Sequence, residues 1–322
     1  MRIKFISIII PVWNDERFIL DSIQSVLNQT FKNFELIIIN NASTDNTLRL
    51  IQEKANLDKR IKVLSLKKNL GMANALNEAI KYSKGEYIAR MDSDDLMYEN
   101  RIEEQVKYMN NNEDVEVLSC LGTYLGVNGN NFGVTSTEII NHQSFKHLIR
   151  NNKPIGLLHS GTIFKKKIVQ EIGGYNKIFW PAEDIDLWNR LALKGHVIYV
   201  QKKILMKYRI HENSIITSKF LDSYNIYKWV KYCLVCKNMN KPEIGYADFI
   251  DYQKKKNIFI KINNLRKLYY SFYLRKLILY ILNKNFLKLL ISIFLLILLR
   301  PFKFFNIPIK RLYKYSYLRK KY

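Results

Sequence analysis

The sequence of 322 residues predicts an α/β protein in which a mostly parallel β-sheet is flanked by helices. Short runs rich in Ile, Val and Leu alternate with segments whose apolar residues recur at helical spacing. Each of the first runs ends in a polar cluster, and ligands of parallel sheets bind beyond the carboxyl ends of the strands. Hydrophobic residues make up 48% of the chain, which is sufficient for a sizeable core.

The first strand is expected over residues 5–12, an apolar run that ends at Asn14. A helix is expected over residues 18–27, where apolar side chains recur on one face. The second buried strand is expected over residues 34–39, followed by the polar run 40–45. The chain therefore begins with one strand, helix, strand unit.

The same alternation continues with a helix through 48–51 and a third strand over 61–66. A helix then opens within 69–77, and the fourth strand covers 87–91. This order argues for parallel strands joined by right-handed crossovers, which gathers their polar ends around one crevice. No dinucleotide-binding glycine motif or P-loop is present, so a dehydrogenase or a P-loop kinase is disfavoured.

An acidic loop follows the fourth strand, with carboxylates at Asp92, Asp94 and Asp95. Three hard oxygen ligands within four positions suit a divalent cation that also contacts a substrate phosphate. The alternative is a helix start, in which Asp94 or Asp95 caps a helix running through 99–104. The residues alone leave both interpretations open.

Residues 115–137 are apolar and rich in Gly and Asn, which is consistent with irregular strands and turns. A loop entering a strand is expected over 151–165, and a glycine turn at 173–175. The segment 180–191 then opens a helix that closes at 194–195, with Glu183 and Asp184 in its first turn. Acids in a first helical turn are ordinary, so spacing alone leaves their role open between helix stabilisation and chemistry.

The net charge of +24 is concentrated in the C-terminal part, because 18 of the 52 Lys and Arg residues follow Asp251 and no acid does. The three cysteines, Cys120, Cys233 and Cys236, are too few for a disulfide framework and lack the second pair of a zinc site. The N-terminal apolar run is short and has no cleavage site, so we expect a cytoplasmic catalytic part.

Six segments in this order resemble the family 2 glycosyltransferases of the GT-A fold. The resemblance extends from Ile6 to about Thr217. It implies a GT-A domain over 1–217. The spacing and composition of the remaining residues favour a helical extension over 218–276 and a membrane-associating tail over 277–322. The segments that resemble the family are residues 7–14, 40–45, 69–71, 90–95, 183–188 and 208–214.

The resemblance implies a site for Mn²⁺ or Mg²⁺ in the acidic loop. Asp94 would be the direct ligand, and Asp92 would bind nearer the donor ribose while also contributing to the metal site. His211 and Arg209 belong to the family's late basic motif, where His211 would meet the metal or the diphosphate. A loop histidine without such a role is the alternative for His211.

The resemblance also implies one displacement that inverts the anomeric configuration. Asp184 matches the general base that deprotonates the acceptor hydroxyl, and Glu183 would orient the acceptor or the base. The donor would be a nucleotide sugar, with UDP favoured over dTDP and GDP. The implied donor-binding residues are Pro11, Trp13, Asn14, Asn41, Asn69, Gly71, Arg90, Asp92 and Arg209.

One segment departs from the family pattern. Its second strand usually ends in Asp-Asp-Gly-Ser, whereas this chain has Asn40, Asn41, Ala42 and Ser43. An amide oxygen can still accept a hydrogen bond from the uracil ring, but without the negative charge that roughly doubles its strength. Asn41 could equally present its amino group to another base.

The tail is apolar over 277–299 and is interrupted by polar residues 283–285 and Lys288. Its cleanest part, 286–299, is shorter than the ~20 residues of a spanning helix, so an interfacial helix is favoured over a single span. Eight Lys and Arg residues over 300–321 match an anionic membrane surface. An ordinary buried helix with a solvated basic end is the alternative.

The sequence thus predicts a metal-dependent inverting glycosyltransferase, peripheral on the inner face of the cell membrane. Its acceptor would be a lipid-linked surface glycan such as capsule, O-antigen or lipooligosaccharide. The alternative is a catalytically inactive GT-A module that binds glycans or acts as a scaffold, for which Asn40 and Asn41 are the best support. Nucleic acid is not expected as a partner, because the basic tail contains an apolar run.

Overall fold

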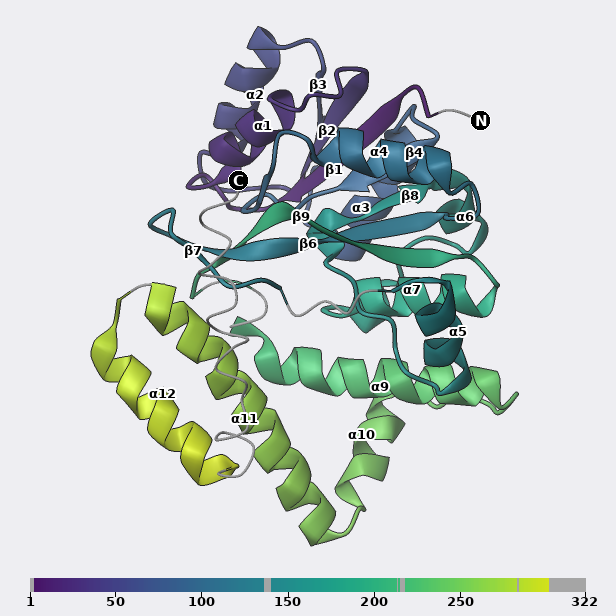
Figure 1. Cartoon of the computed structure of the whole chain (residues 1–322), viewed down its shortest axis with the longest axis vertical. Helices are drawn as coiled ribbons and strands as arrows, with labels where there is room; N and C mark the ends of the chain where they lie inside the picture. Colours follow the sequence, from purple (N-terminus) through teal and green to yellow (C-terminus); the bar gives the residue numbers. More distant parts are fainter. Residues whose placement is uncertain (1–2, 136–139, 213, 215–217, 283, 301–322) are drawn as a thin grey trace. The chain divides into compact units, whose positions relative to one another are not determined.

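The computed structural model describes residues 3–135, 140–212, 214, 218–282 and 284–300 (Figure 1). The chain divides into two compact units. The first comprises Met1–Gly122 and Thr135–Tyr208, and the second comprises Thr123–Val134 and Arg209–Tyr322.

Four parallel strands form one half of the sheet. They are β1 (Ile6–Val12), β2 (Phe34–Asn40), β3 (Ile61–Ser65) and β4 (Tyr87–Arg90), in the spatial order β3-β2-β1-β4. Their bounds lie within one residue of the predicted runs, because strands buried on both faces are continuous apolar segments. All seven residues of β1 and of β2 are buried.

The other half of the sheet brings in antiparallel strands. The short strand β8 (Ile163–Lys165) pairs antiparallel with β4 and with β6 (Val117–Gly126). The order continues through β9 (Ile198–Ile210) to β5 (Leu96–Met97), and β7 (Asn131–Phe132) pairs with β6. The predicted α/β class is confirmed, with the parallel strands confined to the N-terminal half.

Helices cover both faces of this sheet. Successive side chains of β1 point to opposite faces, so they belong to two different hydrophobic cores. Ile8 and Ile10 belong to a core with α1, α2 and α4, whereas Ile9 belongs to a core with α3, α5, α6 and α7. The helices are α1 (Ile19–Leu27), α2 (Thr47–Leu57), α3 (Met72–Tyr82), α4 (Arg101–Asn111), α5 (His142–Arg150), α6 (Lys166–Glu171) and α7 (Glu183–Leu193), with short 3-10 turns at His159–Gly161 and Lys177–Phe179.

The start of α4 decides one open question about the acidic loop. This helix begins at Arg101, and its N-cap residue is Asn100. Asp94 and Asp95 precede β5 instead, so the interpretation of these acids as helix caps is wrong. The chain passes through a short strand before the helix, and the acids remain available for another role.

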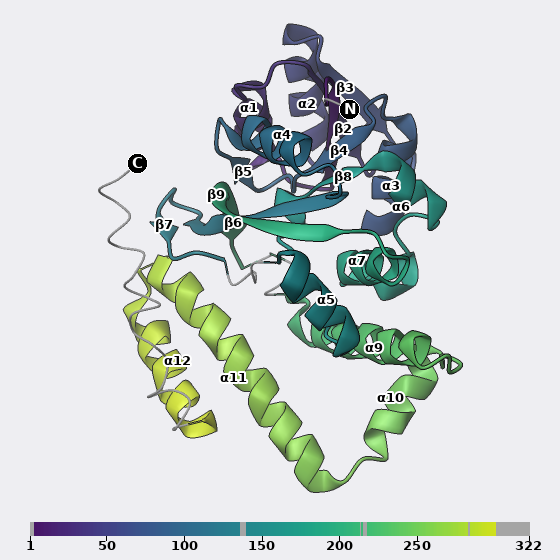
Figure 2. The same ribbon diagram turned by 45° about the vertical axis from the view of Figure 1, so that its right-hand side comes forward.

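The second unit is mainly helical. Its helices are α9 (Phe220–Asn238), α10 (Tyr246–Lys254), α11 (Ile258–Leu282) and α12 (Phe286–Leu299). The last two form an antiparallel hairpin (Figure 2). The predicted boundary between residues 276 and 277 falls within α11. None of the described helices has both the length and the apolarity to cross a membrane.

Candidate active site

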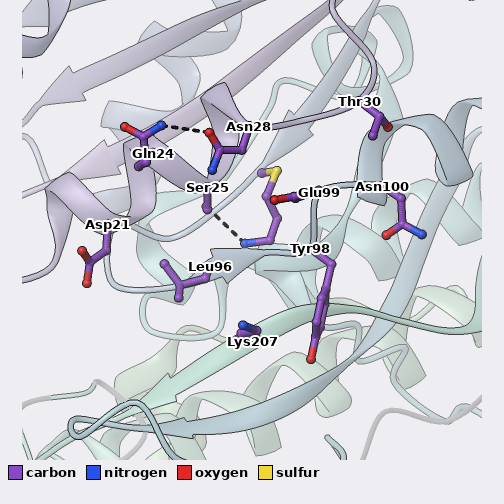
Figure 3. Close-up of a pocket in the computed structure, with 11 residues that line it drawn as sticks. Asp21, Gln24, Ser25, Asn28, Thr30, Leu96, Tyr98, Glu99, Asn100 and Lys207 are labelled. Carbon is purple, nitrogen blue, oxygen red and sulfur yellow. Dashed lines mark hydrogen bonds between the residues drawn. The ribbon is translucent and has the colours of Figure 1, made fainter. Parts of the chain in front are cut away.

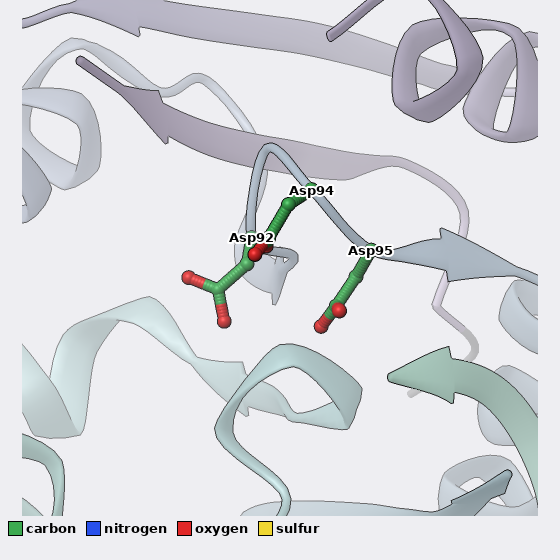
Figure 4. A group of neighbouring side chains, drawn as sticks. All are labelled: Asp92, Asp94 and Asp95. Carbon is green, nitrogen blue, oxygen red and sulfur yellow. The ribbon is translucent and has the colours of Figure 1, made fainter. Parts of the chain in front are cut away.

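The acidic loop brings three carboxyl groups together at the end of β4. One oxygen each of Asp92, Asp94 and Asp95 lies within 4.8 Å of the other two (Figure 4). Asp95 is fully buried, whereas Asp92 and Asp94 are partly exposed. Carboxylate oxygens at this spacing are the donors that Mn²⁺ and Mg²⁺ prefer. The sequence placed Asp95 among three possible oxygen ligands, but the family resemblance assigned it no role of its own.

Two buried serines fix the backbone of this loop. The Ser22 hydroxyl of α1 lies 2.5 Å from the carbonyl oxygen of Ser93 and 2.7 Å from that of Asp95. The Ser160 hydroxyl accepts a hydrogen bond of 2.9 Å from the backbone N–H of Asp92. Both serine side chains are buried. The loop is therefore held from two sides by elements distant in sequence.

Arg90, the last residue of β4, binds Asp92 through both guanidinium Nη atoms. Burial acts to lower the pKa of Arg90, but the charge of Asp92 raises it above its ordinary value. Burial raises the pKa of Asp92, and Arg90 opposes this effect. Arg90 therefore compensates the negative charge of one carboxylate of the loop.

A fully buried arginine supports the same region from α4. Arg101 Nη2 donates to the carbonyl oxygens of Arg90 at 3.0 Å and Thr162 at 3.1 Å. Gln105, one turn later, donates to the carbonyl oxygen of Gly161 at 2.9 Å. Burial lowers the pKa of Arg101 to about 10, so it remains protonated at neutral pH. α4 thus ties the end of β4 to the turn that carries Ser160.

The predicted nucleotide-binding residues are joined by side-chain hydrogen bonds. Asn41 Oδ1 accepts from the backbone N–H of Leu70 at 2.8 Å, and Asn41 Nδ2 donates to Asn69 Oδ1 at 2.9 Å. Asn69 Oδ1 also accepts from the N–H of Gly71 at 2.9 Å. Gly71 has φ +78°, a conformation that glycine adopts without strain. The segments after β2 and β3 therefore form one connected wall.

The segment after β1 joins this wall through Asn14. Its Oδ1 accepts from the N–H of Thr44 at 2.7 Å, and its N–H donates to Ser43 Oγ at 3.1 Å. Pro11 is buried within β1, whereas Trp13 is 56% exposed. The predicted donor residues at the ends of β1, β2 and β3 thus lie along one edge of the sheet.

Glu183 and Asp184 open α7, and their electrostatic neighbours include Arg90 and Asp92. Burial, followed by the charge of Asp184, raises the pKa of Glu183 to about 8. Burial raises the pKa of Asp184 to about 6. The structure therefore brings these acids into the same charged cluster as the acidic loop, although they lie about ninety positions later in the chain.

Two more members of this cluster were not assigned from the sequence. His159 Nε2 and the Tyr175 hydroxyl share a hydrogen bond of 2.8 Å. Burial and Arg90 hold the pKa of His159 well below its ordinary value, so this imidazole is neutral. Tyr175 interacts electrostatically with Asp184, Glu183 and Asp92. No local sequence pattern connects residues so far apart.

Arg190 of α7 fixes the glycine turn that precedes Tyr175. It donates to the carbonyl oxygens of Ile172 at 2.9 Å and Gly174 at 2.7 Å. On the other side, Asn77 bonds to both the N–H and the carbonyl of Tyr175. The position of Tyr175 is therefore set by α3 and α7 together.

Arg209 and His211 belong to the second unit. Arg209 is buried at the end of β9, and the His211 N–H donates to Ser214 Oγ at 3.1 Å. Their predicted contacts with the metal or diphosphate stay predictions.

A groove of about 650 Å³ lies between α1 and the segment through β5 (Figure 3). It begins directly after the acidic loop, since Leu96 follows Asp95. Amide and hydroxyl groups suit an uncharged hydroxylated ligand better than an anion. The groove is lined by Asp21, Gln24, Ser25, Asn28, Thr30, Leu96, Met97, Tyr98, Glu99, Asn100 and Lys207.

The profile of the family described as Glycosyl transferase family 2 matches residues 7–173. This chain belongs to glycosyltransferase family 2. An uncharacterized glycosyltransferase of Haemophilus influenzae is 33% identical over 65% of this chain and 66% of its own length. The putative glycosyltransferase EpsE of Bacillus subtilis is 30% identical over 75% of this chain and 85% of its own length. The putative teichuronic acid biosynthesis glycosyltransferase TuaG of the same organism is 28% identical over 67% and 82%.

Solved glycosyltransferase structures share the fold of this family 2 chain. The mannosyltransferase PcManGT of Pyrobaculum calidifontis, solved with GDP-Man and Mn²⁺, is 16% identical over 76% of this chain and 66% of its own, with a TM-score of 0.56. TarS 1–349 of S. aureus, solved with UDP-GlcNAc, is 18% identical over 90% of this chain and 89% of its own, with a TM-score of 0.56. The predicted GT-A fold and glycosyltransferase class are confirmed.

Proposed function

We propose that this chain transfers one sugar from a nucleotide-sugar donor to a hydroxyl group of a surface glycan, with inversion and with a divalent cation at the acidic loop. The observation that carries the proposal is the convergence of Arg90, Asp92 and the two acids of α7 in one cluster. The sheet edge that holds Asn14 and Asn41 supplies a wall for the nucleotide.

The donor set of the acidic loop fits Mn²⁺ or Mg²⁺. Asp94 is the proposed direct ligand, and the buried Asp95 lies close enough to add a second oxygen. Asp92 is engaged by Arg90, which suits a role nearer the donor ribose. When bound, the cation would stabilise the negative charge of the departing nucleotide diphosphate. We also propose that Arg209 and His211 contact the diphosphate or the metal.

Asp184 is the proposed general base. The acceptor oxygen forms a bond to the anomeric carbon, the bond from that carbon to the diphosphate oxygen breaks with its electron pair, and Asp184 receives the hydroxyl proton. A pKa of about 6 leaves Asp184 ionised at neutral pH. Glu183, with a pKa of about 8, is then protonated and donates a hydrogen bond that orients the acceptor or Asp184.

Asn41 is the proposed reader of the nucleotide base. Its oxygen and its amino group each make one internal bond, and each retains the capacity for one more. The oxygen therefore suits the ring N–H of uracil or thymine. We favour UDP over dTDP and GDP; complexes with UDP-GlcNAc and with GDP-Man share the fold equally and do not separate the two nucleotides.

The proposed acceptor is a lipid-linked surface glycan at the inner face of the membrane. The name of the relative TuaG, which refers to teichuronic acid biosynthesis, supports a glycan of the cell surface. In this arrangement, residues 1–217 hold the chemistry, 218–276 extend it and 277–322 contact an anionic surface. The groove between α1 and the segment through β5 offers amide and hydroxyl partners for further acceptor sugars.

Nucleotide release from a panel of UDP-, dTDP- and GDP-sugars, measured with Mn²⁺, tests the proposal. We expect one nucleotide to be preferred, with turnover lost on chelation and in Asp94→Ala. Asp251→Ala, which removes an exposed carboxylate of α10, is the matched control and should retain turnover. Absence of turnover with every donor, also with a membrane extract as acceptor source, would support the inactive glycan-binding module instead.

A further inference from the structure

The α11–α12 hairpin exposes a large share of the apolar side chains of this chain. Among the described residues, 21 large apolar side chains are exposed, and 12 of them lie on these two helices. Isolated exposed apolar residues are normal, whereas a cluster of them marks an interaction surface. The exposed residues of the hairpin are Ile258, Phe259, Ile260, Ile262, Leu265, Tyr269, Phe286, Leu287, Leu290, Ile291, Phe294 and Leu298.

The hairpin is a built structure, so this exposure does not come from unpacked helices. Tyr270, Leu277 and Leu296 form a small core between α11 and α12. Arg266 of α11 donates from Nε at 3.1 Å and from Nη2 at 2.9 Å to the carbonyl oxygen of Leu299, the last residue of α12. Asn285 caps the start of α12 by accepting from the N–H of Lys288. One stripe of each helix is buried in the hairpin, and the exposed residues face outward.

The charge of the hairpin, together with its apolar side chains, indicates which kind of partner this surface binds. Residues 258–299 contain seven Lys and Arg residues and no acid. Apolar side chains interspersed with cations alone match a bilayer that offers acyl chains below anionic headgroups. The long lysine side chains can place their ammonium groups at headgroup level while their stems stay apolar. Nucleic acid would match the charge but leave the apolar side chains in water.

The dimensions indicate that the hairpin lies along the bilayer surface. α12 has 14 residues and is therefore about 21 Å long, shorter than the ~30 Å hydrocarbon core. α11 is longer, but its basic residues recur from Lys261 to Lys276. An orientation in the plane of the interface keeps these cations in contact with water and headgroups.

We propose that the α11–α12 hairpin is the lipid-binding element of this chain, lying in the surface of an anionic bilayer with the exposed apolar side chains of both helices among the upper acyl chains. The inference rests on the proposed function, in which the acceptor is carried on a membrane lipid. It extends the predicted tail, because six of the twelve exposed apolar residues precede residue 277. The membrane surface is thus formed by two helices.

Vesicle sedimentation of the full chain tests this proposal. Wild-type protein should bind vesicles of phosphatidylglycerol and phosphatidylcholine and should bind pure phosphatidylcholine more weakly. The triple variant Phe259→Ser, Leu290→Ser, Phe294→Ser should lose at least about tenfold in vesicle affinity, because three largely exposed apolar side chains are removed. The control is Leu57→Ser, Leu221→Ser, Met239→Ser, which removes three exposed apolar side chains outside the hairpin and should bind like wild type.

Unchanged vesicle binding by the hairpin variant would overturn the proposal, and so would an equal loss of binding in the control variant. Complete release of wild-type protein by 1 M NaCl would also overturn it, because apolar insertion is not screened by salt. Circular dichroism establishes that each variant is folded. Donor turnover measured on the same samples tests the proposed glycosyltransferase activity, whereas vesicle binding tests the lipid-binding hairpin. The two proposals can therefore fail separately.

Discussion

Glu183 and Asp184 are adjacent carboxyl groups with different expected protonation at neutral pH. The pKa of Glu183 lies near 8 and that of Asp184 near 6, because burial disfavours both charges and the charge of Asp184 adds to the effect on Glu183. An amide imitates a protonated carboxyl group but cannot act as a base. Substitution by the isosteric amide therefore distinguishes their roles.

We expect Asp184→Asn to lower kcat roughly 10²–10⁴-fold at pH 7, because the proposed general base is removed. Glu183→Gln should stay within about fivefold of wild type at the same pH. In wild type, kcat/KM should fall as pH decreases through about 6, where Asp184 becomes protonated, whereas an ordinary aspartate would titrate near 3.8. A pH profile of each variant checks this assignment, which fails if the two amide variants lose equal activity.

Ala42 stands where the family usually has glycine, and it adopts φ +60°. A left-handed conformation destabilises a residue with a Cβ atom by roughly 1–2 kcal/mol. Glycine avoids this strain but loses more conformational entropy on folding, which offsets part of the gain. Ala42→Gly should therefore raise the free energy of unfolding by about 1 kcal/mol, measured by denaturant titration.

Asn14 provides the control for Ala42, because it adopts φ +51° but bonds to Ser43 and Thr44 through its backbone and side chain. Asn14→Gly should lose stability, since the side-chain hydrogen bond is removed. Equal gains in both glycine variants would contradict the strain argument for Ala42.

Candidate residues could be singled out from the sequence where a motif is contiguous, whereas residues whose contacts are long-range could not. Asp92, Asp94 and Asp184 could be singled out from short motifs, and the structure places them in one charged cluster. Ser160 and Tyr175 escaped notice, because their contacts join segments separated by tens of residues and leave no local pattern. Their roles depend on the turn geometry that the whole sheet imposes.

At the scale of elements, the parallel strands were predictable because each is a continuous apolar run bounded by turn residues. Irregular strands and turns were expected over 115–137, which is rich in Gly and Asn, and β6 forms a regular strand of ten residues there. Its pairing with β8 and β9 overrides the local propensity. The hairpin of α11 and α12 was also hidden, because α11 lacks a clear apolar face in sequence.

The turn between α6 and α7 offers a test of element packing. Gly174 has φ +71°, and a Cβ atom there would lie 2.4 Å from Asn77 Oδ1. Gly174→Ala should therefore destabilise the protein by more than about 2 kcal/mol and lower activity, because Asn77 also positions Tyr175.

Gly173 is the matched control for this turn. It has φ +82°, but a Cβ atom there would meet nothing within 4 Å. Gly173→Ala should cost only the backbone strain of roughly 1–2 kcal/mol and leave the active site intact. Thermal unfolding and donor turnover of both variants check the comparison, and equal effects would show that the contact with Asn77 is unimportant.

At the scale of the whole molecule, charge is divided unevenly along the chain. The part that follows Asp251 contains 18 basic residues and no acid, so the rest of the chain accounts for only +6 of the net charge of +24. We expect anionic vesicles to bind the chain in the presence of excess RNA, because RNA offers no apolar phase for the hairpin. Displacement from vesicles by RNA, followed in a sedimentation assay, would instead favour a nucleic-acid partner.

The proposed placement of the α11–α12 hairpin in a bilayer surface would also change how often the enzyme meets its acceptor. A protein held in a bilayer surface and an acceptor anchored in the same surface diffuse in two dimensions, within a layer only nanometres thick. Their effective concentration is then set by surface density and reach, and values in the millimolar range are typical of such tethering. Weak intrinsic affinity for the acceptor sugar would suffice, and each product would leave by lateral diffusion.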